Sequence, residues 1–299
     1  MAIKPNRFGL SCALTTPITE GGGVDLVRLG RHARFVLDGG CDSITLFGTT
    51  GEGAALGLAA RDRMLGAVIG VGVDPAREIY AGVAAAALDD AVGQASVARE
   101  AGARGLLVAP PFYFKGVDDD GLYAWFGQLI ERLKGRARGV ILYHLPAVTA
   151  VPLSVDLVGR LKQAFPGIVV GVKDSSCDWA TTEAFLRAHA HDLSILVGDE
   201  TLLARAMREG GEGSICGVAN IVPGWLRPVV HDAREDGRVS QLVDAISTYP
   251  VIAAVKALTG HVHGDPGYGA MLAPLRALGA AERASLVAAY ERIAAVKAA

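Results

Sequence analysis

Short apolar runs alternate with longer amphipathic segments through most of the chain. Each run is rich in Val, Ile, Leu or Ala and is bounded by Gly, Pro or Asp. Such runs are typical of parallel strands that are buried on both faces. Eight of them occur, at residues 10–14, 43–47, 79–83, 105–109, 140–145, 168–173, 194–198 and 214–218.

The segments between the runs begin with residues that favour the first turn of a helix. Asp25, Ser154 and Asp178 each precede apolar side chains at helical spacing, as do the aspartates at 118–120. Their side chains can accept hydrogen bonds from the free N–H groups of a first turn. Eight strands alternating with helices predict an α/β protein with a (β/α)8 TIM barrel.

After residue 218 the strand pattern stops and the spacing becomes helical. We predict helices over residues 225–234, 239–258 and 281–296, with a break at 260–269, where Gly and Pro are frequent. The predicted organisation is a barrel over residues 1–222, which carries the active site. A C-terminal helical domain follows over residues 223–299.

The overall composition excludes several classes of protein. Hydrophobic residues make up 51% of the chain and charged residues 20%, which favours a large core over disorder. The net charge of -2 does not suggest the basic surface that nucleic acids require. No apolar run approaches the roughly 18–20 residues of a membrane span. We therefore expect a cytoplasmic protein with a small-molecule substrate and neither nucleic-acid nor membrane partners.

The cysteines and histidines do not form a metal-binding pattern. The cysteines at 12, 41, 177 and 216 lack C-x-x-C spacing, so we expect buried or half-buried free thiols. A metal-dependent aldolase would need a histidine cluster, and two pairs are spaced two apart, at 189 and 191 and at 261 and 263. Neither pair falls at a predicted strand end. We expect surface histidines, no metal and no cofactor.

In a TIM barrel the active site lies at the carboxyl ends of the strands, and Lys173 ends the sixth run. Burial there disfavours the ammonium and favours a neutral amine that can attack a ketone. Strand alternation puts residues 169, 171 and 173 on one face, with Gly171 leaving free volume beside the lysine. The alternative is a structural lysine that snorkels to solvent or pairs with Asp174 or Asp199.

The turn at residues 48–52 reads Gly-Thr-Thr-Gly-Glu and follows the second run. Its backbone N–H groups and the hydroxyls of Thr49 and Thr50 form a nest suited to a carboxylate. A pyruvate imine needs such a nest, because its carboxylate must be held while its carbonyl carbon meets the amine. The alternative is a tight turn in which a threonine caps the next helix.

Tyr143 lies near the end of the fifth run, where alternation places it on the inward face with Ile141. A phenol near an imine can carry the proton for carbinolamine dehydration and for making or breaking a C–C bond. The alternative is an aromatic residue of the barrel core whose hydroxyl bonds to the backbone. His144 is expected to point the other way, toward the helices.

Taken in order, these residues resemble the dihydrodipicolinate synthase and N-acetylneuraminate lyase family of pyruvate-dependent class I aldolases. The resemblance runs over residues 10–299, nearly the whole chain. Its matching segments lie at predicted strand ends, at residues 16–17, 48–52, 111–113, 143–146, 171–174, 198–199 and 213–215.

The resemblance implies catalytic roles for four residues. Lys173 is similar to the Schiff-base lysine and Tyr143 to the proton-transfer tyrosine. Thr49 and Tyr113 are similar to the residues that complete the proton relay. In many members this second tyrosine reaches in from a neighbouring subunit, and the family is usually a homotetramer built as a dimer of dimers.

The resemblance also implies a set of substrate-binding residues. Thr50 and Gly48 belong to the turn that holds the pyruvyl carboxylate. The backbone of Ile215 would lie beside the bound pyruvate. Ser175 is a partial match to a threonine of the sialic acid lyases, and Asp199 and Glu200 could bond to a hydroxylated substrate chain.

Departures from the family pattern bear on the second substrate. Val148 stands where dihydrodipicolinate synthases have an arginine that clamps the second substrate's carboxylate, and valine cannot supply that clamp. Leu58 and Arg61 replace a histidine pair of the lysine feedback site, and Phe112 replaces a tyrosine. We therefore expect no inhibition by lysine.

Three functions fit this sequence. The first is a lyase that cleaves, condenses or dehydrates a 2-oxo acid through a Schiff base. The second is dihydrodipicolinate synthase proper, which condenses pyruvate with aspartate semialdehyde, with Arg276 in place of the missing arginine. The third is a paralogue that binds a 2-oxo acid without turning it over.

Overall fold

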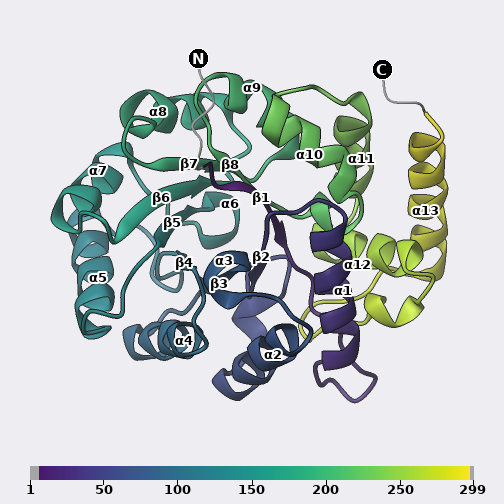
Figure 1. The fold of residues 1–299 in the computed structure, drawn as a ribbon, viewed down its shortest axis with the longest axis horizontal. Helices are drawn as coiled ribbons and strands as arrows, with labels where there is room; N and C mark the ends of the chain where they lie inside the picture. Colours follow the sequence, from purple (N-terminus) through teal and green to yellow (C-terminus); the bar gives the residue numbers. More distant parts are fainter. Residues whose placement is uncertain (1–6, 297–299) are drawn as a thin grey trace.

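The structure, a computed structural model, describes residues 7–296. Its eight parallel strands form a closed barrel in chain order, with β8 paired to β1 (Figure 1). The predicted TIM barrel is confirmed. The strands are β1 (Gly9–Ala13), β2 (Ser43–Leu46), β3 (Ile79–Val83), β4 (Gly105–Val108), β5 (Val140–His144), β6 (Val169–Asp174), β7 (Ser194–Val197) and β8 (Gly213–Cys216).

Helices cover the outside of the barrel (Figure 1). As predicted, side chains of Asp25, Asp118, Ser154 and Asp178 accept hydrogen bonds from first-turn N–H groups. The α-helices are α1 (Leu26–Asp38), α2 (Leu58–Gly70), α3 (Pro75–Glu78), α4 (Leu88–Glu100), α5 (Asp119–Arg132), α6 (Pro146–Thr149), α7 (Val155–Ala164), α8 (Trp179–His189), α9 (Leu203–Arg208), α10 (Pro223–Asp232), α11 (Gly237–Ser247), α12 (Val251–Val262) and α13 (Ala280–Ala294). Short 3-10 helices are η1 (Gly53–Ala55), η2 (Glu200–Leu202), η3 (Val218–Asn220) and η4 (Pro266–Gly269).

The C-terminal part is helical, as predicted, but one predicted helix is wrong. The expected helix over 239–258 is two helices, α11 and α12, whose axes differ by 120°. Pro250 separates them, because proline disfavours helical backbone at the preceding residue. Among the described residues no single helix has the length and apolarity of a membrane span, and α11 with α12 passes only as this bent pair. The division of the chain after residue 222 stays a prediction.

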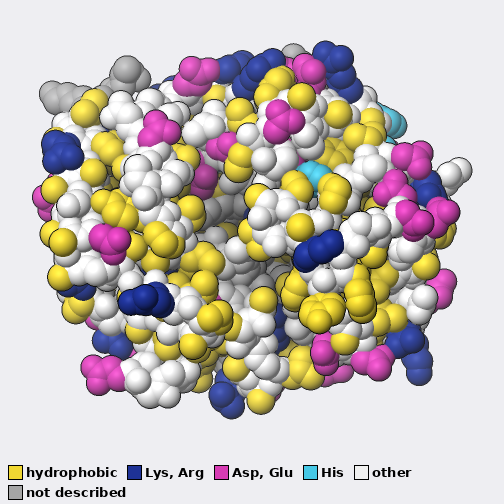
Figure 2. Space-filling model, turned by 180° about the vertical axis from the view of Figure 1, so that it is seen from behind, with side chains coloured by type: hydrophobic (Ala, Val, Ile, Leu, Met, Phe, Trp, Pro, Cys, Tyr) yellow, Lys and Arg dark blue, Asp and Glu magenta, His cyan; other side chains and the backbone are white. Residues whose placement is uncertain are grey.

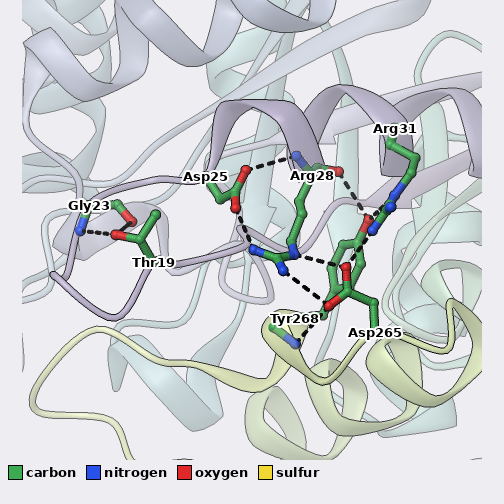
Figure 3. A network of polar contacts seen from close by, with 8 residues as sticks. Thr19, Gly23, Asp25, Arg28, Arg31, Asp265 and Tyr268 are labelled. Carbon is green, nitrogen blue, oxygen red and sulfur yellow. Dashed lines mark hydrogen bonds and ion pairs between the residues drawn. The ribbon is translucent and has the colours of Figure 1, made fainter.

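Polar contacts fasten the segment after α12 to α1 (Figure 3). Asp265 accepts hydrogen bonds from Arg28 Nε at 2.9 Å and Arg31 Nη2 at 2.6 Å. Tyr268 donates to the Arg28 carbonyl at 3.2 Å. These pairs are partly exposed, so each contributes little stability alone, but together they hold the C-terminal segment against the barrel.

A buried histidine makes a second link between the same parts. His32 of α1 places its Nδ1 2.9 Å from His263 Nε2 and its Nε2 2.9 Å from Asn220 Oδ1. Asn220 in turn donates its amide N–H groups to the carbonyls of Ala13 and Gly217, both at 2.8 Å. The expectation of a solvated surface histidine is therefore wrong for His263, because the tertiary fold places it against α1.

The barrel interior is filled and closed at the amino end of the strands. Phe8 and Tyr80 pack there, with ring centroids 4.8 Å apart. Above them lie inward-facing side chains that form a cluster distinct from the core between strands and helices, including Leu107, Ile141 and Leu196. A packed interior leaves the carboxyl end as the open end of the barrel.

Strand β6 contains an irregularity that the alternation pattern did not predict. Val140 pairs with Val169, but the next residue, Ile141, pairs with Gly171. Val169 therefore joins the outer core while Val170 packs toward the inner cluster. The expected common face for 169, 171 and 173 is wrong at 169, since a bulge shifts the register by one residue.

Candidate active site

Lys173 and Tyr143 meet inside the open end of the barrel. They are register partners on the neighbouring strands β6 and β5. Lys173 is 5% exposed, and its Nζ lies 3.2 Å from the Tyr143 hydroxyl. Within residues 7–296 the amine makes no ion pair with a carboxylate, so neither a snorkelling nor an ion-paired lysine describes it. Asp174 instead accepts from Ser176 and Thr182.

The Tyr143 hydroxyl lies in an environment that favours its ionised form. Burial opposes the phenolate, but the Lys173 charge stabilises it. Hydrogen bonds from Thr49, Lys173 and Ser175 add to that effect, and the net result is a lowered pKa of Tyr143. A tyrosine with this environment can both donate and accept a proton beside the amine.

The turn at 48–52 approaches this pair from β2. The backbone at Phe47 and Glu52 has φ values of 62° and 56°, in the left-handed region that non-glycine residues rarely adopt. Gly51 packs against the backbone, since a Cβ there would lie 2.5 Å from the Leu14 carbonyl oxygen. Neither threonine caps a helix, because Glu52 precedes η1 and Gly57 precedes α2 without a side-chain cap. The helix-cap alternative is therefore wrong.

Two adjoining cavities open at this end of the barrel. The larger, of about 900 Å³, is lined by most of the predicted site residues. These are Lys173, Tyr143, Thr49, Thr50, Ser175, Asp199 and Ile215. The smaller, of about 500 Å³, is lined by Gly48, Thr49 and Tyr143 and by mostly apolar side chains. Figure 2 shows one face hollowed near its centre, bordered largely by apolar and uncharged atoms.

Tyr113 is the predicted site residue that the single chain does not bring to Tyr143. It lies in the loop after β4, 73% exposed, and lines neither cavity. Its ring packs edge-on against Phe114, with centroids 5.3 Å apart. In the single chain Tyr113 therefore makes no part of the site.

Gly198, near the lysine, was not predicted as a site residue. A Cβ on Gly198 would lie 3.1 Å from Lys173 Cε and would overlap the Ser175 hydroxyl.

The predicted role for Gly171, to leave free volume beside the lysine, is wrong, since a Cβ there would meet the Ser194 carbonyl oxygen of β7 at 2.6 Å. Glu200 lines the larger cavity, and burial raises its pKa although it accepts from Val218 N–H at 2.8 Å. Its position after a strand end made Glu200, like Asp199, an expected partner for a hydroxylated substrate chain, and that role stays a prediction.

His144 points away from the cavities, as predicted. Its Nδ1 accepts a hydrogen bond from the Leu153 N–H at 2.9 Å, and its ring packs against Phe185 of α8. It therefore shapes the outer layer rather than the site.

The four cysteines are free, as predicted, but Cys177 is exposed rather than buried. It lines the mouth of the larger cavity, in the loop that follows β6. Partial loss of water around the sulfur and the neighbouring Asp199 carboxylate raise its thiol pKa to about 11. The thiol is thus protonated at neutral pH and is a weak nucleophile.

Charged side chains of the larger cavity are distributed unevenly. The cations are Lys173 and, on the segment after η4, Arg276, whose side chain is exposed. The acids are Asp199, Glu200 and Asp244. Val148 lines both cavities and is 61% exposed, so no guanidinium occupies that position.

Comparison with known sequences identifies the family. Residues 6–289 match the Dihydrodipicolinate synthetase family. The chain belongs to this family. The resemblance predicted from the strand-end motifs is confirmed, and the match covers the barrel and most of the helices that follow it.

Individual members of the family are similar over nearly the full length. An uncharacterised DapA-like lyase of Chloroflexus aurantiacus is 34% identical over 296 residues, covering 95% of this chain and 96% of the relative. The 4-hydroxy-tetrahydrodipicolinate synthase 1 of Streptomyces coelicolor is 34% identical over 300 residues, covering 96% and 95%.

Solved structures give the same result. A dihydrodipicolinate synthase from Agrobacterium tumefaciens superposes with a TM-score of 0.93 at 47% identity, covering 96% of this chain and 99% of that one. A 2-keto-3-deoxygluconate aldolase variant of Sulfolobus solfataricus has a TM-score of 0.83 at 22% identity, covering 96% of each chain. The similarity to the aldolase, at 22% identity, shows only that the two chains share a fold.

Proposed function

We propose that this chain is a metal-independent class I lyase in which Lys173 forms a Schiff base with pyruvate or another 2-oxo acid. Its family consists of lyases, which sets the reaction class. The observation that carries the proposal is the Lys173 amine 3.2 Å from the Tyr143 hydroxyl, in a cavity that Thr49 and Thr50 also line. An amine, a proton carrier and a carboxylate nest are the groups that imine formation requires.

The residues divide the chemistry among them. Lys173 Nζ attacks the ketone carbon to give a carbinolamine, which loses water to form the imine. Tyr143 supplies the proton that leaves with that water, and the resulting phenolate takes up a proton in the later carbon-bond step, assisted by Thr49. Thr50 and Gly48 hold the carboxylate, while Ile215, Ser175 and Asp199 border the rest of the substrate.

Aldol cleavage, condensation or dehydration of a 2-oxo acid is the reaction that the cavity supports best. Val148 offers an apolar surface where a carboxylate-binding arginine would be needed for aspartate semialdehyde. One observation favours dihydrodipicolinate synthase as the second candidate. Arg276 lines the same cavity as Lys173 and can supply a guanidinium from the C-terminal segment.

We also propose a homotetramer in the cytoplasm, in which a neighbouring subunit contributes Tyr113. Three apolar side chains on the loop after β4, Tyr113, Phe114 and Val117, are exposed, and Val148 lies exposed after β5. Exposed apolar side chains gathered on neighbouring loops are typical of a subunit interface.

Trapping the imine tests the central claim. Pyruvate with borohydride should irreversibly add one pyruvate-derived group to the protein, measured by intact mass. Lys173→Ala should abolish the adduct. Lys162→Ala, which removes a surface lysine paired with Asp192 at 3.0 Å, is the matched control and should retain it. A wild-type protein that stays unmodified would end the proposal.

A substrate panel separates the candidate functions. Turnover of 2-oxo-3-deoxy sugar acids without condensation of aspartate semialdehyde supports the first candidate, and efficient condensation supports the second. Trapping without turnover of any substrate would indicate a binding paralogue. EDTA should leave activity unchanged if no metal takes part.

A further inference from the structure

Arg61 is a buried cation without a carboxylate partner among the described residues. It lies on α2 and is 1% exposed. Its guanidinium donates to three backbone carbonyls, those of Gly53 at 2.7 Å, Gly82 at 2.8 Å and Leu56 at 3.1 Å. Neutral carbonyls satisfy the N–H groups but leave the charge uncompensated, which is costly in a low-dielectric interior.

This guanidinium lies directly behind the threonine turn. Its acceptor Gly53 is the residue after the turn, and Gly53 N–H itself bonds to the Gly48 carbonyl at 3.0 Å. The Arg61 Cζ lies 4.6 Å from the centroid of the Phe47 ring. Phe47 is the residue before the turn. Gly53 and Gly82 line the smaller cavity together with Thr49. Arg61 thus spans both ends of the turn from the protein side.

The buried charges around the turn do not balance. Glu52, within the turn, pairs with Lys256 of α12, and both side chains are fully buried. Glu52 also accepts the Leu272 N–H at 2.7 Å. One buried carboxylate and two buried cations, Lys256 and Arg61, therefore border the turn, and the carboxylate pairs with Lys256. Burial lowers the pKa of Arg61 to about 10, which still leaves it charged at neutral pH.

We propose that the missing anion is the substrate's carboxylate, and that Arg61 is a positioning residue whose buried charge selects anionic 2-oxo acids for the threonine turn. This inference rests on the proposed function. A carboxylate that Thr50 and Gly48 hold brings its charge to the other side of the strand end that Arg61 supports. The attraction between the guanidinium and the carboxylate acts through protein rather than through water, so salt screens it only weakly.

The test compares an anionic with a neutral ketone on the same lysine. The rate of borohydride-dependent labelling is measured with pyruvate and with hydroxyacetone. The pyruvate rate divided by the hydroxyacetone rate is the ratio that reports selectivity for the carboxylate. Arg61→Gln keeps hydrogen-bond donors but removes the charge, and should lower the ratio roughly tenfold, the scale of an interaction between unit charges about 12 Å apart at an effective dielectric constant of about 20. Arg61→Lys keeps the charge and should hold the ratio near the wild-type value.

Arg99→Gln is the matched control. Arg99 is also buried, at 7% exposure, and donates to a backbone carbonyl, that of Ala103. It precedes β4 at the amino end of the barrel, so its loss should reduce stability without changing the ratio. A merely structural role for Arg61 would slow both ketones equally.

The outcomes separate the two proposals. A wild-type protein that traps neither ketone refutes the Schiff-base function itself. A wild-type protein that traps pyruvate, with an unchanged ratio in folded Arg61→Gln, refutes the role of Arg61 alone. If Arg61→Gln does not fold, Arg61→Lys tests the proposal instead. Because this variant keeps the charge, a tenfold drop in its ratio would refute a role for the charge of Arg61.

Discussion

At the scale of single residues, the candidate site depends on how closely Tyr143 and Gly198 approach the Lys173 side chain. Lys173 touches Tyr143 on one side, and its stem runs beside Gly198 on the other. Only glycine leaves that space, since a Cβ at 198 would crowd both Lys173 and Ser175. The position of the nitrogen that we propose to react is therefore set partly by a residue that has no side chain.

Gly198→Ala should displace the lysine. We expect imine trapping with pyruvate to slow at least tenfold, and the free energy of unfolding to fall by about 1–3 kcal/mol from overpacking. Trapping rates and urea unfolding measure the two effects. Gly66→Ala, where a Cβ meets nothing within 4 Å, is the control and should leave trapping unchanged. Normal trapping in Gly198→Ala would mean that the lysine does not need this space.

At the scale of elements, the C-terminal helices are joined to the barrel at its catalytic end. His32 connects α1 to His263 after α12 and to Asn220 of η3. Asn220 holds the chain after β1 and β8, and Gly217, one of its acceptors, lines the larger cavity. A neutral His32 fits this arrangement, since Asn220 Oδ1 accepts from Nε2 and leaves Nδ1 to accept from His263.

This linkage predicts a specific sensitivity to acid. Burial lowers the pKa of His32 to about 3, while the unfolded chain binds the proton near 6.5. The contribution of neutral His32 to the free energy of unfolding is therefore complete above about pH 6.5. It declines as the pH falls toward 3, by up to about 1.4 kcal/mol per pH unit. Urea unfolding at pH 7, 6 and 5 measures it.

The His32→Gln variant isolates this group from the other titrating residues. Its free energy of unfolding should be lower than that of wild type at pH 7, and the difference should shrink as the pH is lowered to 5. Parallel pH dependences in the two proteins would contradict a neutral buried His32.

At the scale of the whole molecule, one chain holds most but not all of the proposed machinery. The larger cavity gathers residues from β1, β5, β6 and β8 and from the turns that follow β2 and β7. Tyr113 lies outside it on an exposed apolar loop. A second copy that places this loop against the barrel mouth would bury the exposed rings and complete the relay, as expected for a symmetric oligomer.

Mixed oligomers test that arrangement. Tyr113→Phe and Lys173→Ala should each be nearly inactive, but unfolding and refolding them together should restore activity in about a quarter of the sites by random pairing. Steady-state rates of the mixture and its mass by light scattering are the measurements. Each variant refolded alone is the control. A mixture that remains inactive although it forms oligomers would place Tyr113 outside the partner's site.

The sequence by itself determined the barrel and the central pair of the site. Eight apolar runs bounded by turn residues leave few arrangements other than a closed parallel barrel. Once β5 and β6 are neighbours, strand-end positions bring Tyr143 and Lys173 together. The turn at 48–52 could be identified only together with Lys173 and Tyr143, because a Gly-Thr turn at a strand end can equally cap a helix.

Only the tertiary structure decided the features that depend on contacts between distant segments. The bulge in β6, the charge imbalance at Arg61 and the space that Gly198 leaves beside Lys173 arise from packing of neighbours that are far apart in sequence. The burial of His263 against α1 arises in the same way. Local periodicity carries no information about such neighbours, because it reports which face a residue lies on and not what it meets there.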